Sequence, residues 1–189
     1  MGPKIFCVAL LTCCASWASA QDAAPDFRIG PRAGPGDLRI NAGEAIGDEI
    51  VESVQSEDTV GIGGTFEYRP IFGLVLEVGL FSSGSTDWFD SEDYRFTEYF
   101  GSVGYQIDLG SGFSITPRVG RARWKLESDD VWFFDEDDDP PTTRGYQNYW
   151  EVTAMKRIND RFSLGVSHKE NHHDFGRVRS TVFTAMFDL

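Results

Sequence analysis

The sequence predicts an all-β fold, an eight-stranded antiparallel up-and-down transmembrane β-barrel. Three observations predict it. Eight segments of about ten residues alternate between apolar and polar side chains, as the strands of a membrane barrel do. The connections alternate between short turns and longer, mostly acidic loops. Charged side chains gather on one face of the alternating segments and are almost absent from the other.

The first twenty residues have the pattern of a secretory leader. An apolar run over residues 5–11 precedes Ala18 and Ala20, which form an A-x-A cleavage pattern. The run is shorter than the ~20 residues of a spanning helix. We therefore expect residues 1–20 to be a signal peptide. A lipoprotein signal is the alternative, because two of the three cysteines follow the apolar run.

Composition excludes several function classes. All three cysteines lie in the expected leader, so the mature chain would have neither a catalytic thiol nor a cysteine metal site. The formal net charge is −13, which makes nucleic acid an unsuitable partner because its binding needs basic stripes. No sequence motif indicates a cofactor.

The domain organisation follows from the position of the segments. Residues 21–36 hold three prolines and three glycines and are expected to form a flexible N-terminal segment. Residues 37–189 are expected to form the barrel domain. Its predicted strands are 37–46, 58–69, 72–82, 94–107, 113–125, 147–158, 162–170 and 177–189.

The predicted connections are sorted by length. Those at 69–72, 108–112 and 159–161 are short and turn-like. Three others are longer and mostly acidic, and the last is short and polar: 47–57, 83–93, 126–146 and 171–176. Short turns at one end and long loops at the other are typical of the periplasmic and extracellular ends of an outer-membrane barrel.

The stretch "FEYRPIFGLVLEVGLF", residues 66–81, shows the alternation most clearly. A soluble barrel would turn its apolar face inward, whereas a membrane barrel turns it toward lipid. We assign the apolar face to lipid. It consists of Leu38, Ile40, Ala42, Val60, Ile62, Phe66, Tyr68, Leu74, Leu76, Val78, Leu80, Tyr99, Val103, Tyr105, Ile107, Phe113, Ile115, Val119, Trp150, Val152, Ala154, Leu164, Val166, Phe183, Ala185, Phe187 and Leu189.

The opposite face carries the charges and is expected to line the lumen. Its four acids and five bases nearly balance, as a closed interior requires for pairing. They are Arg39, Glu67, Arg69, Glu77, Glu98, Arg118, Glu151, Arg157 and Lys169. Eight strands leave an interior that side chains can fill, so we expect a plugged lumen. Lys156 breaks the rule but lies beside a short turn, where it can snorkel.

The leader, the eight amphipathic segments, the stretch over 66–81 and the final "STVFTAMFDL" together resemble the small eight-stranded OmpA/OmpX-type barrels of Gram-negative bacteria. The resemblance covers the mature chain and implies a place in the cell outer membrane. It also implies that the last strand carries the signal read by the barrel-insertion machinery, here Phe183, Ala185, Phe187 and Leu189. The chain departs from this family by ending on Leu189, where an aromatic residue is usual.

The expected function is that of a structural or surface-interaction barrel without enzymatic activity, with a possible extracellular ligand at its acidic loops. A lipid A-modifying enzyme and a narrow transport barrel for small apolar solutes are the alternatives. His168 has the position of a catalytic histidine of lipid A deacylases, but Glu170 stands where a serine nucleophile is needed. The acidic run 127–139 lacks the spacing of a calcium loop, so we predict no specific metal site.

Six bases break the polarity rule at one end of their strands only. They lie on the apolar face where the strands meet the long loops: Arg95, Arg121, Arg123, Lys125, Arg177 and Arg179. An outward arginine costs about 2–4 kcal/mol at mid-bilayer but little near the interface. Because a guanidinium can hold a phosphate with two hydrogen bonds, we expect a rim that binds lipopolysaccharide, with the first three bases as neighbours.

Overall fold

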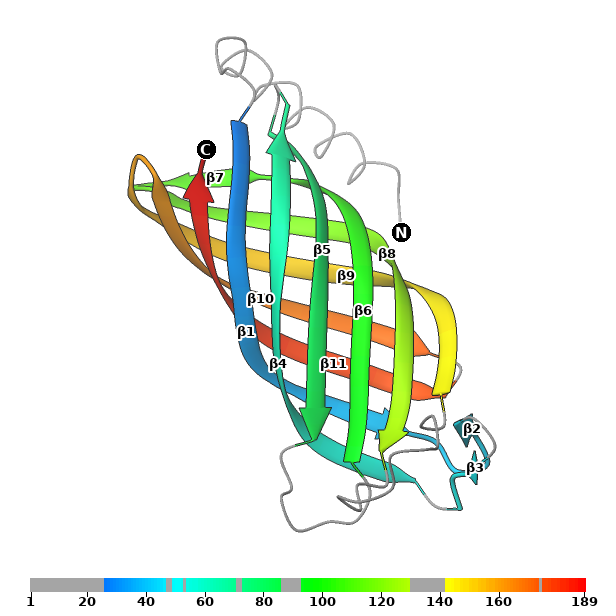
Figure 1. Ribbon diagram of the computed structural model, residues 1–189. Coiled ribbons are helices and arrows are strands. Elements are labelled where there is room, and N and C mark those ends of the chain that lie inside the picture. Colours follow the sequence, from blue (N-terminus) through cyan, green and yellow to red (C-terminus); the bar gives the residue numbers. More distant parts are fainter. Residues whose placement is uncertain are drawn as a thin grey trace, which may run out of the picture.

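The computed structural model describes a barrel of long antiparallel strands (Figure 1). The described residues are 26–46, 49–52, 54–70, 73–85, 93–129, 142–173 and 175–189. The expected signal peptide and most of the acidic run 127–139 lie outside them. Within these ranges, no helix has the length and apolar character needed to cross a membrane.

Except for the first strand, the strands of the barrel wall extend farther at their loop ends than the sequence predicts. The wall consists of β1 (Asp26–Ile40), β4 (Gln55–Arg69), β5 (Leu74–Ser85), β6 (Asp93–Tyr105), β7 (Ile107–Gly110), β8 (Phe113–Asp129), β9 (Thr142–Asn159), β10 (Phe162–His173) and β11 (Gly176–Asp188). A separate hairpin, β2 (Ala45–Ile46) and β3 (Glu49–Ile50), lies between β1 and β4.

The wall closes into a barrel with each strand beside its neighbour in sequence. The hydrogen-bonded order runs β6-β5-β4-β1-β11-β10-β9-β8-β7, and β6 also pairs with β8. β7 continues β6 along β8, so among the described residues the two count as one of eight wall strands. The first and last strands, β1 and β11, pair antiparallel and close the seam. The predicted up-and-down fold is confirmed.

The first strand begins at Asp26, so the expectation that residues up to 36 form a flexible segment is wrong from that point on. The pairing of β1 with β4 is continuous over the whole strand. The pairing with β11 is interrupted at 30–31 and at 34–35. These interruptions fall at Pro31 and Pro35, whose nitrogens cannot donate to a neighbouring strand. Prolines and glycines thus mark gaps in one ladder and do not mark a loop.

The corrected strand also reverses the predicted orientation of its residues. Side chains alternate without a break from Asp26 to Ile40. Arg28 and Arg32 are buried in the lumen, and Leu38 and Ile40 are buried at its far end. Arg39 is exposed on the outer wall, where it faces Arg177 in the register. Its expected place in the lumen, and the expected lipid-facing place of the two apolar residues, are therefore wrong.

The short turns form where glycine permits the required backbone. Gly73, Gly110 and Gly112 have φ values of 71°, 85° and 76°, in the region that other residues rarely adopt. Both termini of the described chain lie at this short-turn end, at the top of Figure 1. The strand ends that the longer connections join lie at the opposite end, together with the β2–β3 hairpin.

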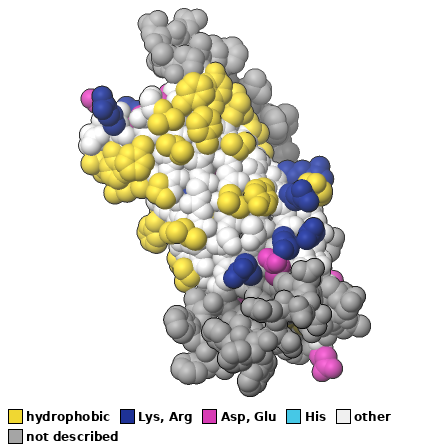
Figure 2. Space-filling model, viewed as in Figure 1, with side chains coloured by type: hydrophobic (Ala, Val, Ile, Leu, Met, Phe, Trp, Pro, Cys, Tyr) yellow, Lys and Arg dark blue, Asp and Glu magenta, His cyan; other side chains and the backbone are white. Residues whose placement is uncertain are grey.

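The outer wall carries the apolar face that the sequence predicts, apart from the changes in β1. Apolar side chains cover much of the visible wall in Figure 2, and a group of Lys and Arg side chains lies to the lower right. Near the short-turn end, Phe27 stacks on Tyr68 at 4.8 Å, and Phe162 lies 5.1 Å from Phe187. Lys156 donates to the carbonyl oxygen of Ser111. Its Nζ also lies over the ring of Phe113 at this end of the wall, so the expected snorkelling geometry is present.

Candidate functional site

The middle of the lumen is built around Arg32 of β1. Its Nη1 lies 3.3 Å from Glu77 Oε1 on β5, and its Nη2 lies 2.6 Å from Glu151 Oε1 on β9. All three side chains are at least 97 % buried. Thr65 donates to Glu77 at 2.6 Å, which gives this carboxylate a further partner. A buried carboxylate needs such partners to offset the loss of water.

Arg118 of β8 forms the second centre of this network. It donates to Glu67 and to the hydroxyl of Thr153. Its Nε lies 3.4 Å from Glu77, and its Nη1 lies 3.5 Å from Glu151. The two guanidinium groups therefore contact three carboxylates from three different strands, and Glu77 and Glu151 contact both guanidinium groups. Such a mesh links opposite sides of the barrel through side chains alone.

On the loop-end side of this centre, Lys169 pairs with Glu98. Asn171 donates to the other oxygen of that carboxylate at 3.2 Å. The Lys169 Nζ lies 3.9 Å from the ring centre of Tyr149 and 4.5 Å from that of Phe100. The ammonium is thus enclosed by a carboxylate and two aromatic faces, an arrangement that favours a desolvated cation.

On the short-turn side of this centre, Arg28 pairs with Asp188 and donates to the Ser163 hydroxyl at 2.9 Å. Arg69 pairs with Glu67 at 3.2 Å. A polar cavity of about 270 Å³ lies at this mouth, and Arg28 and Arg69 line it. Arg157 also lines this cavity and is exposed, so it lies at the lumen entrance and not in the buried network.

The structure brings most members of the expected network together. Seven of the nine predicted residues line the buried lumen, whereas Arg39 faces outward and Arg157 lies at the mouth. The sequence interpretation missed Arg28 and Arg32 because both fall in the segment expected to be flexible. With them, the paired charges within the described lumen include five bases and five acids: Arg28, Arg32, Arg69, Arg118, Lys169, Glu67, Glu77, Glu98, Glu151 and Asp188. The partly exposed Asp26 also lies 3.7 Å from Arg28.

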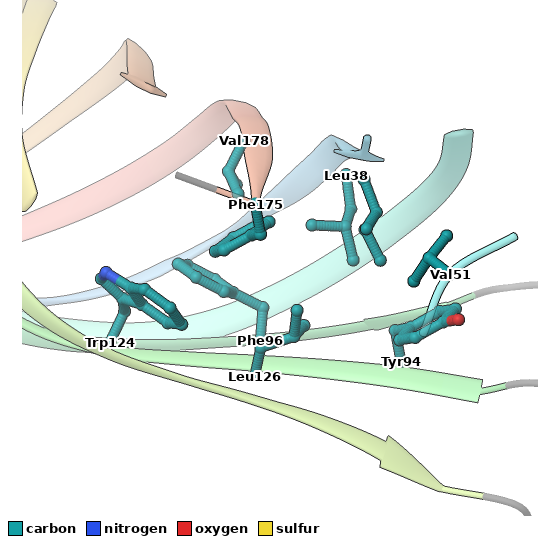
Figure 3. Packing of buried hydrophobic residues seen from close by; sticks show 9 residues of the cluster. Leu38, Val51, Tyr94, Phe96, Trp124, Leu126, Phe175 and Val178 are labelled. Carbon is teal, nitrogen blue, oxygen red and sulfur yellow. The ribbon is translucent and has the colours of Figure 1, made fainter. Parts of the chain in front are cut away.

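An apolar cluster closes the loop end of the lumen (Figure 3). Trp124, Phe96 and Phe175 point toward one another, and the rings of Trp124 and Phe175 are 4.9 Å apart. The buried His173 ring stacks on Phe175 at 4.6 Å. Val51, from the connection that follows the β2–β3 hairpin, lies beside Tyr94 at the edge of the cluster. The other members are Leu38, Ile40, Tyr94, Leu126 and Val178.

The six predicted rim bases all lie on the outer wall. Arg95, Arg121 and Arg123 are exposed, and the other three are partly exposed. Among the latter, Lys125 pairs with Glu127, and Arg179 lies 3.4 Å from Glu170. The loop ends also bring exposed bases that the sequence interpretation did not include, Arg39 and Arg144.

The register corrects one expectation about this rim. Arg95 lies opposite Glu127, whereas Arg121 and Arg123 lie opposite Gly101 and Tyr99. Arg95 is therefore on the strand next to the other two bases but is not their neighbour. The offset between β6 and β8 depends on the turn that joins them, and strand assignment alone does not determine it.

The histidine that the sequence singles out also lies on the outer wall. His168 is exposed, its ring lies 5.7 Å from that of Trp150, and its Nδ1 lies 3.4 Å from the hydroxyl of Thr181. Glu170 stands where a serine nucleophile is needed, but the pairing of β10 with β11 brings the Thr181 hydroxyl to this histidine. Glu170 instead contacts His172 and Arg179. Within the described residues, no carboxylate contacts His168.

A family model described as "Outer membrane protein beta-barrel domain" matches residues 5–189. The chain belongs to this outer-membrane β-barrel family. It is therefore a protein of the outer membrane, and its short-turn end and loop end correspond to the periplasmic and extracellular ends of the family's fold. In such a barrel, the exposed Phe183, Phe187 and Leu189 of the last strand and its terminus face lipid, as predicted.

Solved structures of small outer-membrane barrels share the fold. Neisserial surface protein A has a TM-score of 0.62 at 11 % identity, covering 88 % of this chain and 99 % of that one. Ail, the attachment invasion locus protein of Yersinia pestis, was solved in complex with the heparin analogue sucrose octasulfate; it has a TM-score of 0.57 at 10 % identity, covering 87 % and 99 %. The N-terminal barrel of Pseudomonas aeruginosa OprF has a TM-score of 0.51 at 12 % identity, covering 88 % and 100 %. A comparison with curated proteins found no significant match.

Proposed function

We propose that this outer-membrane barrel is a sealed, non-enzymatic protein with a structural or surface-interaction role. The observation that carries the proposal is the set of buried side chains that reach across the lumen. Two barriers lie in series along it, the ion-pair network centred on Arg32 and Arg118 and the aromatic cluster around Trp124. An ion crossing such a lumen would have to break buried pairs, each costly to disrupt.

The conductance of the purified protein tests this proposal. After reconstitution into a planar bilayer, the protein is expected to give no discrete current steps, while a general porin in the same bilayer gives them. Reproducible unitary steps from the wild-type protein would show an open lumen. They would support the alternative of a narrow transport barrel.

The exposed bases at the extracellular end support a second part of the proposal, an anchoring contact with lipopolysaccharide. Arg121 is the ninth residue of β8, and Arg179 is the tenth from the end of β11. A tilted strand crosses the bilayer core in about 9–11 residues, so both bases would reach the headgroup level. Phosphates there would find guanidinium groups that can donate two parallel hydrogen bonds.

A matched pair of triple variants tests the anchoring contact. The first replaces Arg95, Arg121 and Arg123 with Gln. The second replaces Lys156, Arg157 and Arg161, the bases at the short-turn end, with Gln and makes the same change in charge. Added lipopolysaccharide is expected to raise the unfolding midpoint of wild type and of the second variant, but not of the first. Equal stabilisation of all three proteins would exclude the rim contact.

An extracellular partner would meet the loops. The segments 44–58, 87–93 and 127–139 are rich in Asp and Glu, so the proposal favours a partner with a basic surface over a sulfated one. The complex with a sulfated heparin analogue is a finding for Ail alone. It shows that a barrel of this fold can bind a sulfated ligand.

A further inference from the structure

The outer wall carries a groove of about 540 Å³ across β8, β9 and β10 that the charged lumen and the rim do not explain. We propose that this groove is a discrete binding site for one phosphorylated lipid of the outer leaflet. The inference rests on the proposed rim function and assigns it a specific site.

The strand register arranges the groove in two rows. Toward the extracellular end, Arg121 lies opposite Asn148, and His172 also lines this part. One step nearer the membrane centre, Val119 lies opposite Trp150. The polar donors thus lie on the extracellular side of an apolar row. The phosphate and the hydrocarbon chain of an outer-leaflet lipid follow each other in the same order.

The polar row is free to hold an anion. The Arg121 guanidinium lies 5.2 Å from the ring centre of Tyr146 and makes no ion pair with any residue that the structure describes. Glu170 is the one acid in the lining, and its carboxylate lies 3.5 Å from His172 and 3.4 Å from Arg179. Its charge is therefore opposed by a neighbouring guanidinium. The guanidinium of Arg121 and the Asn148 amide can both donate to a phosphate.

The apolar row is exposed and fits a hydrocarbon chain. Val119 is 62 % exposed and Trp150 is 43 % exposed. The Trp150 ring also lies 5.7 Å from the ring of His168. A lipid in this groove would pack its chain on these side chains while its phosphate contacts Arg121. A free phosphate would make only the second contact.

Titration of the folded protein with diphosphorylated lipid A in phosphatidylcholine vesicles tests the site, with the unfolding midpoint as the readout. Arg121→Gln and Asn148→Leu are each expected to raise the lipid A concentration for half-maximal stabilisation about tenfold. This change corresponds to the loss of one charge-assisted hydrogen bond. Arg144→Gln is the matched control, since it removes an exposed rim base outside the groove lining. Heat-modified gel mobility confirms that each variant is folded.

Three other outcomes are informative. If Arg121→Gln and Arg144→Gln weaken the response equally, or if Asn148→Leu responds as wild type does, the rim attracts lipid A without a discrete groove site and the inference is wrong. If wild type gains no stability from lipid A, both the groove and the rim contact are wrong. If inorganic phosphate or lipid A without phosphates stabilises as well as intact lipid A does, the ligand is not a phosphorylated lipid.

Discussion

Arg28 on the first wall strand donates to both carboxylate oxygens of Asp188 on the last. The two residues are paired across the seam that β1 and β11 form when the barrel closes. The arginine side chain is 2 % exposed and the aspartate side chain 13 %. Because every other wall junction joins segments consecutive in the chain, this seam brings together residues that are farthest apart in sequence. The ion pair fastens that junction at its periplasmic end.

Asp188→Asn is expected to destabilise the barrel by about 1.5–3 kcal/mol, because it removes the charge-assisted hydrogen bonds of the buried Arg28 guanidinium. Asp26, which is partly exposed and lies 3.7 Å from Arg28, then remains as its counter-charge. Asp160→Asn, in an exposed turn, should change stability by no more than about 0.5 kcal/mol. Urea unfolding in lipid vesicles, followed by tryptophan fluorescence, measures both. Similar midpoints for the two variants would mean that the seam pair adds nothing.

Reversal of a lumen charge should have a larger effect. Glu77→Lys would set a third cation beside Arg32 and Arg118 and would remove the acceptor for Thr65. We expect a loss of about 3–5 kcal/mol or failure to fold. Glu52→Lys, an exposed change of the same kind, is the control and should cost little. The fraction of folded protein by gel mobility distinguishes misfolding from weak stability.

The two arginines on β1 separate the observed orientation of that strand from the predicted one. Arg32→Met would leave Glu151 and Glu77 short of a partner and should cost about 3–5 kcal/mol. Arg39→Met, on the exposed face, should cost less than about 1 kcal/mol. The opposite order of unfolding midpoints would support the orientation that the sequence alone predicts.

The alternating pattern predicts the wall strands from β4 to β11 because each has one lipid face and one lumen face, and a slip of one residue would exchange them. Glu67, Glu77 and Glu151 show this: each lies between apolar neighbours that face outward. The partners of these carboxylates could not be predicted. They depend on the stagger of the strands around the barrel, which no single segment encodes.

The first strand could not be predicted by the same rules. Pro31 and Pro35 are ordinary loop signals, and central strands rarely contain proline. Here their nitrogens fall where the ladder with β11 is interrupted. Arg28 and Arg32 lie four residues apart, so both fall on one face of a strand, and this spacing is the signal that could have identified it. Both side chains are buried in the structure. Beginning the strand at residue 37 detached it from that pattern and reversed the orientation of Leu38, Arg39 and Ile40.

The N-terminal leader provides a separate prediction. We expect cleavage after Ala20, because Ala18 and Ala20 follow a short apolar run. The mass of the protein extracted from outer membranes would then correspond to a chain that begins at Gln21. A mass that includes Met1 would show an uncleaved chain, and a lipid-modified Cys13 or Cys14 would identify a lipoprotein.

The last prediction concerns His168, whose surroundings differ from what the sequence suggests. Its Nδ1 lies 3.4 Å from the Thr181 hydroxyl, so a hydroxyl and an imidazole do meet on the lipid-facing wall. Acyl transfer also needs a group that orients the imidazole and donors for the developing oxyanion. Glu170 is engaged with His172 and Arg179, and β10 and β11 are paired along their length, which commits their amides to the sheet. We therefore expect the His168–Thr181 pair to be a cross-strand contact without catalytic activity.

Mass spectrometry of lipid A from cells that express the protein tests this expectation. Wild type, His168→Ala and Thr181→Val should all leave the acyl chains of lipid A as they are in cells without the protein. His168→Ala should also leave the unfolding midpoint nearly unchanged, since the side chain is exposed and its hydrogen bond is long. Loss of one acyl chain with wild type, but with neither variant, would instead assign a deacylase in which Thr181 is the nucleophile and His168 the base.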